Sequence, residues 1–221
     1  YFLLKYIMEQ GTLGPIYRIE SRVHGAHGIP GDWRQDPKQG GGMVYDWGIH
    51  LIDQAAMLYP DAKIKSVYAT LNYVTNQLAD DGFMVDLLFD NGVHYLVDVG
   101  TSNFITLPRW LILGQDGTMW MDNWGNDVKV ICAKGKDEKD VQPVVTAAGL
   151  TKTMAPRAED TLEESYIERM DSDVHDYYRN FVKAIDGIEE QMVTHDQMRC
   201  ILKIIMTAFE SVEKGGDAII W

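Results

Sequence analysis

Two strand-like segments, residues 83–89 and 93–99, are apolar at nearly every position and are separated by Asp90-Asn91-Gly92. Asn-Gly between two such runs is typical of a β-hairpin turn. A sheet covered on only one face should alternate apolar and polar side chains. Because these strands do not alternate, we expect both faces of their sheet to be buried. Another subunit or domain, or a second helical layer of this chain, would cover the second face.

Further segments extend this pattern into an α+β fold. A second hairpin is centred on residues 114–117, and Gly11, Gly187 and Pro60 end predicted helices. The predicted strands are 16–23, 65–74, 83–89, 93–99, 110–113, 118–121, 128–132 and an edge strand at 218–221, and the predicted helices are 1–10, 43–59, 174–185 and 194–212. This order of elements predicts a large, mostly antiparallel open sheet with helices on one face.

Two segments near the C-terminus give weaker signals. Residues 134–170 are charged and lack clear periodicity, so we interpret them as an extended loop. Helix 174–185 has the spacing of a helix packed on a sheet, and we expect at least one of Tyr177 and Tyr178 in the core. No repeat or linker divides the chain, which predicts a single domain over residues 1–221.

The charge balance narrows the classes of partner. The chain carries 33 acidic and 20 basic side chains, a formal net charge of −13. Such a surface argues against nucleic acid and against anionic membranes, which both require clustered cations. No segment reaches the roughly 20 apolar residues of a membrane span. Cys132 and Cys200 are too few for a disulfide framework, so we expect a reducing, cytoplasmic setting.

The segment that follows the glycine triplet 40–42 contains a polar stripe. Asp46, His50 and Asp53 are spaced at four and three residues, which places them on one face of a helix. Buried polar side chains cost free energy unless they are paired or used, so this stripe is a candidate site. The glycines lack G-x-G-x-x-G spacing and do not predict a dinucleotide site.

Three interpretations of the stripe remain open from the residues alone. Asp46 can orient His50 for a purely structural reason. His50 with Asp46 and Asp53 has the ligand types of a divalent metal site, although no second histidine has the spacing of a zinc protease, and we predict no metal. The third interpretation is acid–base chemistry, in which His50 accepts and donates a proton while Asp46 holds the ring and favours its charged form.

The stretch Trp33-Arg34, followed by Gly40-Gly41-Gly42-Met43-Val44-Tyr45-Asp46-Trp47-Gly48-Ile49-His50-Leu51-Ile52-Asp53, resembles the signature of the Gfo/Idh/MocA oxidoreductases. These are the relatives of glucose–fructose oxidoreductase and inositol dehydrogenase. Residues 11–16 are similar to that family's G-x-[IL]-G-x-I entry to its second domain. Residues 194–212 with Gly215-Gly216 resemble its closing helix and last strand. The resemblance thus spans nearly the whole chain.

The resemblance implies a C-terminal domain of the glyceraldehyde-3-phosphate-dehydrogenase-like type, which binds substrate and forms oligomers. An N-terminal Rossmann domain, absent from this chain, would bind NAD or NADP and carry a Glu-Lys-Pro motif, so no cofactor-binding residue is expected here. The substrate would be a sugar, a polyol or a related hydroxyl compound. We expect a homo-oligomer, dimer or tetramer, formed through the open sheet face, and an isolated fragment that is inactive.

The resemblance also assigns site residues. It places Asp46 and His50 as catalytic residues in the substrate site beside the nicotinamide. Trp33 and Arg34 would stack on a sugar and bind its hydroxyls, although anchoring a surface loop explains them equally well. His27 and Tyr45 are further substrate-binding candidates, and a structural or solvent-facing role remains open for His27. A different class of function is also open: a carbohydrate-binding or scaffolding protein that kept this fold without the chemistry.

Overall fold

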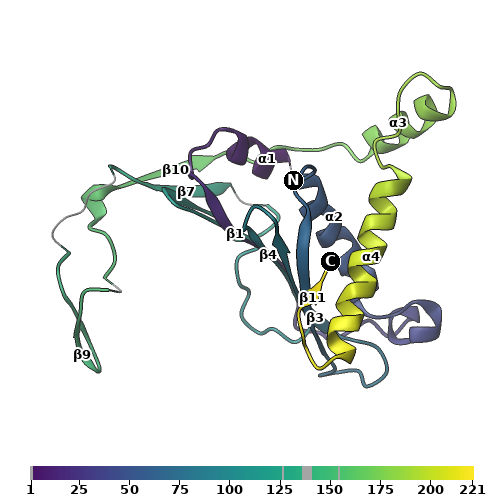
Figure 1. The fold of residues 1–221 in the computed structure, drawn as a ribbon, viewed down its shortest axis with the longest axis horizontal. Coiled ribbons are helices and arrows are strands. Elements are labelled where there is room, and N and C mark those ends of the chain that lie inside the picture. The colour runs from purple at the N-terminus through teal and green to yellow at the C-terminus, as the bar shows by residue number, and fades with distance from the viewer. Residues whose placement is uncertain (1, 126, 136–140, 154) are drawn as a thin grey trace.

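A nine-stranded sheet forms the centre of the molecule, seen in a computed structural model that describes residues 2–125, 127–135, 141–153 and 155–221 (Figure 1). The strands lie in the order β10-β7-β6-β5-β1-β4-β3-β2-β11. Their bounds are β1 Ile16–His24, β2 Ile64–Asn72, β3 Gly82–Phe89, β4 His94–Gly100, β5 Trp110–Gly114, β6 Gly117–Met121, β7 Val128–Ala133, β10 Leu162–Ile167 and β11 Ile219–Ile220. Among the described strands, only β1 and β4 are parallel neighbours; every other pairing in the sheet is antiparallel. The predicted α+β fold with a mostly antiparallel sheet is confirmed.

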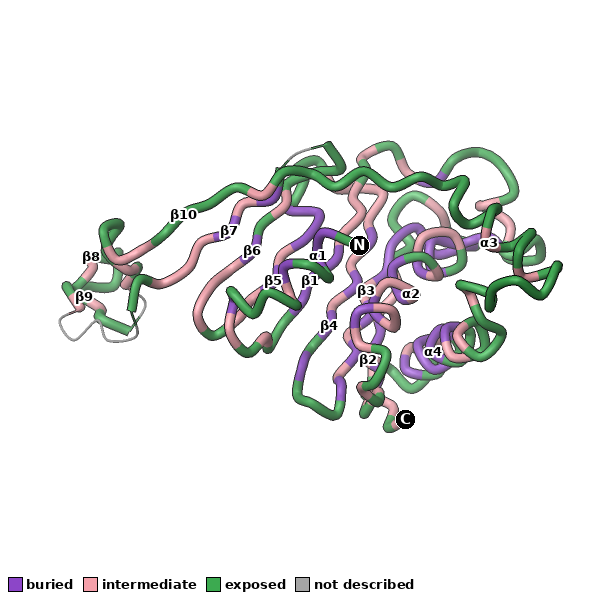
Figure 2. The backbone as a smooth tube through the Cα atoms, turned by 90° about the horizontal axis from the view of Figure 1, so that it is seen from above, coloured by how far each residue is buried: buried purple, intermediate pink, exposed green. Residues whose placement is uncertain are grey.

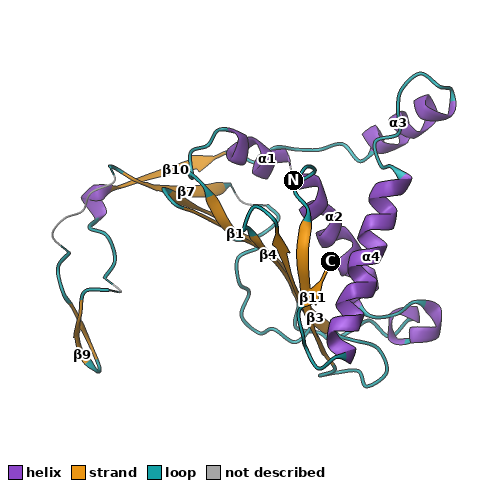
Figure 3. Ribbon diagram, viewed as in Figure 1, coloured by secondary structure: helices purple, strands orange, loops and turns teal. Residues whose placement is uncertain are grey.

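Three helices cover one face of this sheet, as Figure 3 shows in purple. They are α1 Phe2–Glu9, α2 Ile49–Leu58 and α4 His195–Glu213. Their apolar side chains meet those of the sheet in one core, which includes Leu4, Ile52, Phe83, Val97, Ile112 and Ile205. None of the described helices is long and apolar enough to cross a membrane.

The predicted hairpin at residues 90–92 joins β3 and β4, with Phe83 opposite Val99. Side chains of β3 that face the helices are buried, and those on the opposite face are only partly buried. Buried and partly buried side chains therefore alternate along β3, but apolar and polar side chains do not. The apolar Met84 and Leu88 lie on the outer face together with Asp86. In the described part of the chain, no second helical layer covers that face (Figure 2).

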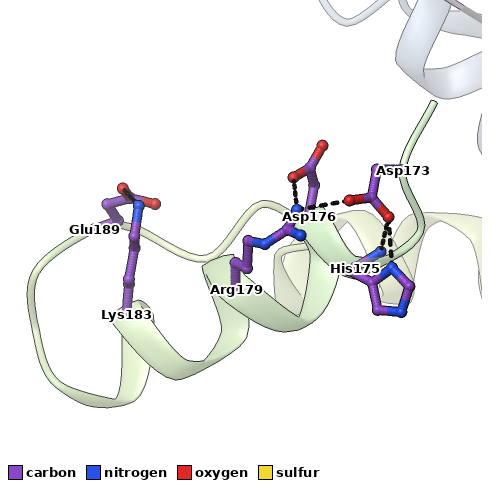
Figure 4. Close-up of polar contacts among 6 residues, drawn as sticks. All are labelled: Asp173, His175, Asp176, Arg179, Lys183 and Glu189. Carbon is purple, nitrogen blue, oxygen red and sulfur yellow. Dashed lines mark hydrogen bonds and ion pairs between the residues drawn. The ribbon is translucent and has the colours of Figure 1, made fainter. Parts of the chain in front are cut away.

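Helix α3, His175–Ile185, corrects one expectation. It lies away from the sheet (Figure 1), and Tyr177 and Tyr178 are both exposed rather than in the core. Its polar side chains bond one another: Arg179 binds Asp173 and Asp176, as Figure 4 shows. The helical spacing correctly predicted an amphipathic helix, but spacing does not state what the apolar face contacts.

The segment 134–170 is more ordered than a loop. It contains a short hairpin, β8 Val144–Thr146 with β9 Gly149–Thr151, and then the edge strand β10. Positions 136–140 and 154 lie outside the described residues. Strand β10 gave no sequence signal because most of its side chains are exposed on both faces, so polarity does not alternate.

Candidate functional site

The loop that follows β1 carries Arg34 on a single helical turn. Asp32 caps this turn, Trp33–Gln35, by accepting a hydrogen bond from the Arg34 amide at 3.0 Å. A second turn, Pro37–Gln39, is capped in the same way by Asp36. Side-chain oxygens of Asp commonly satisfy the free amides at helix starts. These caps hold the Arg34 backbone in place beyond the end of β1.

Two of the three glycines allow close contacts within the chain. A Cβ on Gly41 would lie 2.5 Å from the Arg34 carbonyl oxygen, and the Gly42 amide donates to that same oxygen at 2.9 Å. Gly42 has φ +108°, and a Cβ there would lie 2.1 Å from Oδ1 of Asp80. Gly41 and Gly42 therefore pack against the chain itself, which leaves no open space where a Cβ would stand.

Asp80 anchors the start of the helix that follows the glycines. Its Oδ2 accepts from the Val44 amide at 2.9 Å, and its carbonyl accepts from the Met43 amide. Burial raises the pKa of Asp80 above its usual range, against the effect of these bonds. This residue was not predicted from the sequence, because it lies 36 positions after Val44. Its only sequence signal is a pair of acids, Asp80-Asp81, directly before an apolar strand.

The predicted helix 43–59 begins with a wider turn than expected. Residues Val44–Gly48 form a π-helix, and the α-helix α2 starts at Ile49. Such π-turns often occur at functional sites. Asp46 lies in the π-turn and His50 in the first turn of α2, so the two side chains do not follow the simple 3.6-residue stripe.

Both residues nevertheless line one open cavity of about 650 Å³. Its walls come from the ends of β1 and β4, the loop after β1, the π-turn and α2, and they include Val23, Gly28, Arg34, Asp46, Trp47, His50, Val99 and Thr101. His50 is exposed, and the Trp47 ring meets it edge-on with a centroid separation of 6.4 Å. The cavity therefore presents an acid, an imidazole and a guanidinium together.

The hydrogen bond of Asp46 differs from the one that we expected. Oδ2 of Asp46 accepts from Nε of Arg34 at 3.0 Å, and within the described residues it makes no hydrogen bond to His50. Neither ring nitrogen of His50 has a protein partner in those ranges. The hydrogen bond to Asp46 raises the pKa of Arg34 above its already high usual value, so the guanidinium stays charged. Among the described residues, Asp46 therefore binds Arg34 through Oδ2 and is not hydrogen-bonded to the imidazole, and the role of Asp46 stays a prediction.

The other predicted site residues lie near the cavity but not in its walls. Trp33 is exposed, and the Arg34 guanidinium lies 4.6 Å from the centre of its ring. Tyr45 packs on Phe209 of α4 with ring centroids 5.4 Å apart. His27 is exposed, whereas its neighbour Gly28 lines the cavity.

Asp53 does not join the stripe. Its Oδ1 accepts a hydrogen bond from Gln197 at the start of α4, so this acid ties two helices together. Among the described residues, no group of three or more His, Cys, Asp or Glu side chains is placed to hold a metal ion.

Comparisons with known proteins agree with this geometry. A family model described as GFO/IDH/MocA C-terminal domain matches residues 1–120, more than half of the chain. The chain belongs to the GFO/IDH/MocA family. It is the C-terminal domain, and the resemblance stated from the motifs is confirmed.

Solved structures extend the likeness over the whole chain. An NAD-binding protein from Listeria innocua is 37% identical with a TM-score of 0.91, over 99% of this chain and 63% of that one. An oxidoreductase from Bacillus cereus shares the fold with a TM-score of 0.71 at 16% identity, over 100% of this chain and 72% of that one. An uncharacterized oxidoreductase of Schizosaccharomyces pombe is 42% identical over 57 residues, 25% of this chain and 16% of its own length. The chain thus spans less than two thirds of the first-named structure and about a sixth of the yeast relative.

Proposed function

We propose that this GFO/IDH/MocA domain is the substrate-binding part of an NAD(P)-dependent oxidoreductase. The substrate would be a sugar, a polyol or a related hydroxyl compound, and His50 would accept the hydroxyl proton. One observation carries the proposal: Arg34, Asp46 and His50 line the same open cavity. Family membership and the oxidoreductase relatives support the reaction class.

His50 is placed to move a proton. Imidazole gains and loses protons near neutral pH, and a base must reach the proton that it abstracts. The ring is exposed, and within the described residues its nitrogens have no competing partner. The Trp47 ring lies edge-on beside it. A substrate hydroxyl in the cavity can therefore donate to this imidazole without displacing a protein hydrogen bond.

Asp46 and Arg34 would hold the substrate. The pair uses only Oδ2 of Asp46, and in the described structure Oδ1 makes no hydrogen bond, so it can accept from a second hydroxyl. Arg34 is fixed by Asp32 and Asp46 and keeps the carboxylate neutralised. Alignment of a hydroxyl against a base contributes strongly to catalysis, by several kcal/mol in favourable cases.

The cofactor would be held by a further part of the longer protein. Gly41 and Gly42 contact the chain itself, whereas His50 is exposed at the cavity, so a planar ring carried by another domain would have access to it. A bound nicotinamide would supply the hydride acceptor. The similarity to the Listeria innocua relative, an NAD-binding protein, supports this assignment.

The assembly and compartment are also proposals. The outer sheet face carries the exposed rings of Tyr17, Trp120 and Tyr166, and a hollow of about 850 Å³ lies over β6, β7 and β10. Exposed aromatic surface of this kind favours association, so we propose a homo-oligomer, dimer or tetramer, formed through this face. Cys132 and Cys200 are both free, which supports a cytoplasmic setting.

The test is turnover of a panel of polyols and sugars by the longer protein that carries this chain. We expect His50→Ala to lower kcat/KM by about 100-fold or more, the range of a lost general base. Asp53→Asn is the matched control, because this acid lies on the same helix and bonds Gln197 outside the cavity. Equal turnover by wild type and His50→Ala would reject the proposed role. Sugar binding without any turnover would instead favour the carbohydrate-binding alternative.

A further inference from the structure

Arg109 lies directly before β5 and is buried, with 4% of its surface exposed. Nη1 donates to the Ser21 hydroxyl at 2.8 Å, and Nη2 reaches the Gln54 side-chain oxygen at 3.4 Å. Nε has no hydrogen-bond partner among the described residues. The rings of Trp110 and Trp124 lie on the guanidinium at 4.7 and 4.4 Å. All of these partners are neutral.

Arg109 has no carboxylate partner among the described residues, and in this it differs from six other arginines of the chain. Six others in the described ranges each form an ion pair with an acid: Arg18, Arg22, Arg34, Arg169, Arg179 and Arg199. Those six are more exposed than Arg109, which belongs to a chain of net charge −13. Arg109 is thus the most buried of the arginines compared, and it is the one without an acidic partner.

A buried cation without a partner is costly, and folding tolerates it where the group is used. Burial lowers the pKa of Arg109 to about 10, which still leaves the guanidinium charged at neutral pH. Two aromatic faces and the Ser21 hydroxyl fix its position. A fixed, charged and under-bonded guanidinium is suited to bind an anion, because little order has to be created on binding.

A pocket of about 370 Å³ lies against this guanidinium. Its walls include Gln54, Trp124, Met121, Arg169 and Ser172, together with Phe2 at the start of α1. Arg169 adds a second cation, and Asp171, which also lines the pocket, pairs with it at 2.9 Å. The pocket therefore combines amide and hydroxyl groups, apolar walls, one internal ion pair and the unpaired positive charge of Arg109.

This pocket lies beside the candidate active site. Gln54 follows His50 by four residues on α2, a rise of about 6 Å along the helix axis. Trp47 of the cavity and Trp124 of the pocket are in contact, with ring centroids 6.2 Å apart. Three main-chain bonds of an extended backbone span about 3.5 Å. By the same measure, the five carbon–carbon bonds of an extended six-carbon chain span about 6 Å, which is close to this rise.

We propose that the Arg109 pocket binds the carboxylate of the substrate, and that the enzyme acts on sugar acids of the aldonate or uronate class. This inference rests on the proposed function, because it concerns a second subsite of the same reaction. The carboxylate pairs with Arg109 and accepts from Gln54 after its amide turns. The hydroxyl to be oxidised then lies one helix turn away, at His50.

The experiment uses the longer protein with D-gluconate and D-glucitol, which share a six-carbon polyhydroxyl chain and differ at one end by a carboxylate. We expect kcat/KM for gluconate to exceed that for glucitol by about 10-fold or more, the usual effect of a charge-assisted hydrogen bond. In Arg109→Gln the ratio should fall to within about threefold, by the same reasoning. Arg179→Gln, on the remote helix α3, is the matched control and should keep the ratio.

Two further measurements do not depend on turnover by Arg109→Gln. Gluconate should raise the melting temperature of the wild type more than glucitol does. Gln54→Glu places a carboxylate beside Arg109, so this variant should melt at a higher temperature than the wild type and should lose the preference for gluconate. Both results follow from one uncompensated charge in the pocket.

Other outcomes overturn the inference. These are equal stabilisation by gluconate and glucitol, a preference of Gln54→Glu for gluconate, or stronger stabilisation by a sugar phosphate than by gluconate. A structure of the longer protein with an acidic side chain of another segment bonded to Arg109 would overturn it too. The proposed function can fail separately: absent turnover of every hydroxyl compound would reject the oxidoreductase role, while selective stabilisation by gluconate would still demonstrate the carboxylate site.

Discussion

In the loop after β1, Arg34 lies 4.6 Å from the ring centre of Trp33 and pairs with Asp32 and with Asp46, which precedes α2. Directly before β5 and beside Gln54 of α2, Arg109 lies 4.7 Å from the ring centre of Trp110 and pairs with no acid among the described residues. Both arginines border a cavity, and each lies beside an aromatic ring. They differ in how their charge is balanced: among the described residues, acids pair with Arg34 and none pairs with Arg109.

The two cavities differ in the use of their buried charges: some hold the backbone in place, and one has no acidic partner in the described part of the chain. Around the first cavity, Asp80 holds the Val44 amide and Asp81 holds residues 74–76, so buried acids are used to fix backbone. Around the second, aromatic rings fix a cation whose charge stays available. A buried group that is positioned but unpaired is the stronger pointer to a ligand, because the fold itself gains little from it.

The largest effect that we predict tests the scaffold of the first cavity. Gly42→Ala should lower the free energy of unfolding by about 3 kcal/mol, since it combines a left-handed backbone with overpacking against a buried carboxylate. Gly42 has φ +108°, and its Cβ would lie 2.1 Å from Asp80. Urea unfolding measures the change. Gly40→Ala is the control: φ is +79° but no atom lies within 4 Å, so only the backbone cost of about 1 kcal/mol remains.

A contradictory result would be equal losses in the two glycine variants. The clash with Asp80 would then contribute nothing, and the start of α2 would not depend on that carboxylate.

The second prediction concerns Asp81, whose carbonyl oxygen accepts hydrogen bonds from Thr101 of the cavity wall and whose carboxylate binds residues 74–76. Burial alone would raise its pKa, but hydrogen bonds from the 74–76 backbone and the Thr75 hydroxyl outweigh this and hold the pKa of Asp81 below its usual range. Its contribution to stability is therefore complete above the ordinary Asp pKa of about 4 and is lost as the pH falls through the lowered value. Asp81→Asn should cost about 2 kcal/mol at pH 7, because several donors lose a charged acceptor.

Asp80→Asn is the matched comparison for this effect. Burial raises the pKa of Asp80, so the folded state binds its proton more tightly than the unfolded chain does. Stability from this group therefore falls as the pH rises from about 4 through the raised pKa, opposite to Asp81. Unfolding curves between pH 3 and 7 should show the difference between wild type and variant changing in opposite directions for the two acids. Parallel changes would contradict the assigned shifts.

Much of the fold was open to prediction because its signals are local. The hairpin at residues 90–92, helix 194–212 and the placement of Asp46 near His50 each depend on neighbours within a few positions. Strand β10 and the position of α3 were not predictable in this way. Their side chains are exposed, so neither the alternation of a half-buried strand nor the partner of an amphipathic face was encoded nearby.

The site was harder to predict because its polar contacts join distant segments. Asp53 bonds Gln197, which is 144 positions away, and Arg109 bonds Ser21, which is 88 positions away. A helical stripe of acids predicts which face they share, but not which of them points at a partner helix. Family resemblance selected Asp46 and His50; their chemical roles remain predictions.

The third prediction sharpens the comparison at Arg34. Arg34→Gln should lower kcat/KM for polyols by about 10-fold, because Asp46 loses the charged hydrogen bond that positions it. Arg34→Lys should recover part of the loss, since it restores charge but not the fork of donors. Steady-state kinetics of the longer protein give both values. Arg18→Gln, which removes an ion pair with Glu20 away from the cavity, is the control, and a loss there as large as in Arg34→Gln would contradict the assignment.

The smallest effect tests the contact between the two regions. Trp124 stacks on Arg109 at 4.4 Å and touches Trp47, so Trp124→Leu removes an aromatic face from the buried cation. We expect a loss of about 1 kcal/mol in unfolding free energy, in the range of a partly desolvated cation–π contact. Trp120→Leu is the control, because that indole bonds Asp122 on the outer face. In a double-mutant cycle with Arg109→Gln, the coupling should account for most of the Trp124→Leu loss. Strict additivity would show that the ring does not stabilise the cation, and Ser21 would then be left as its main support in the protein.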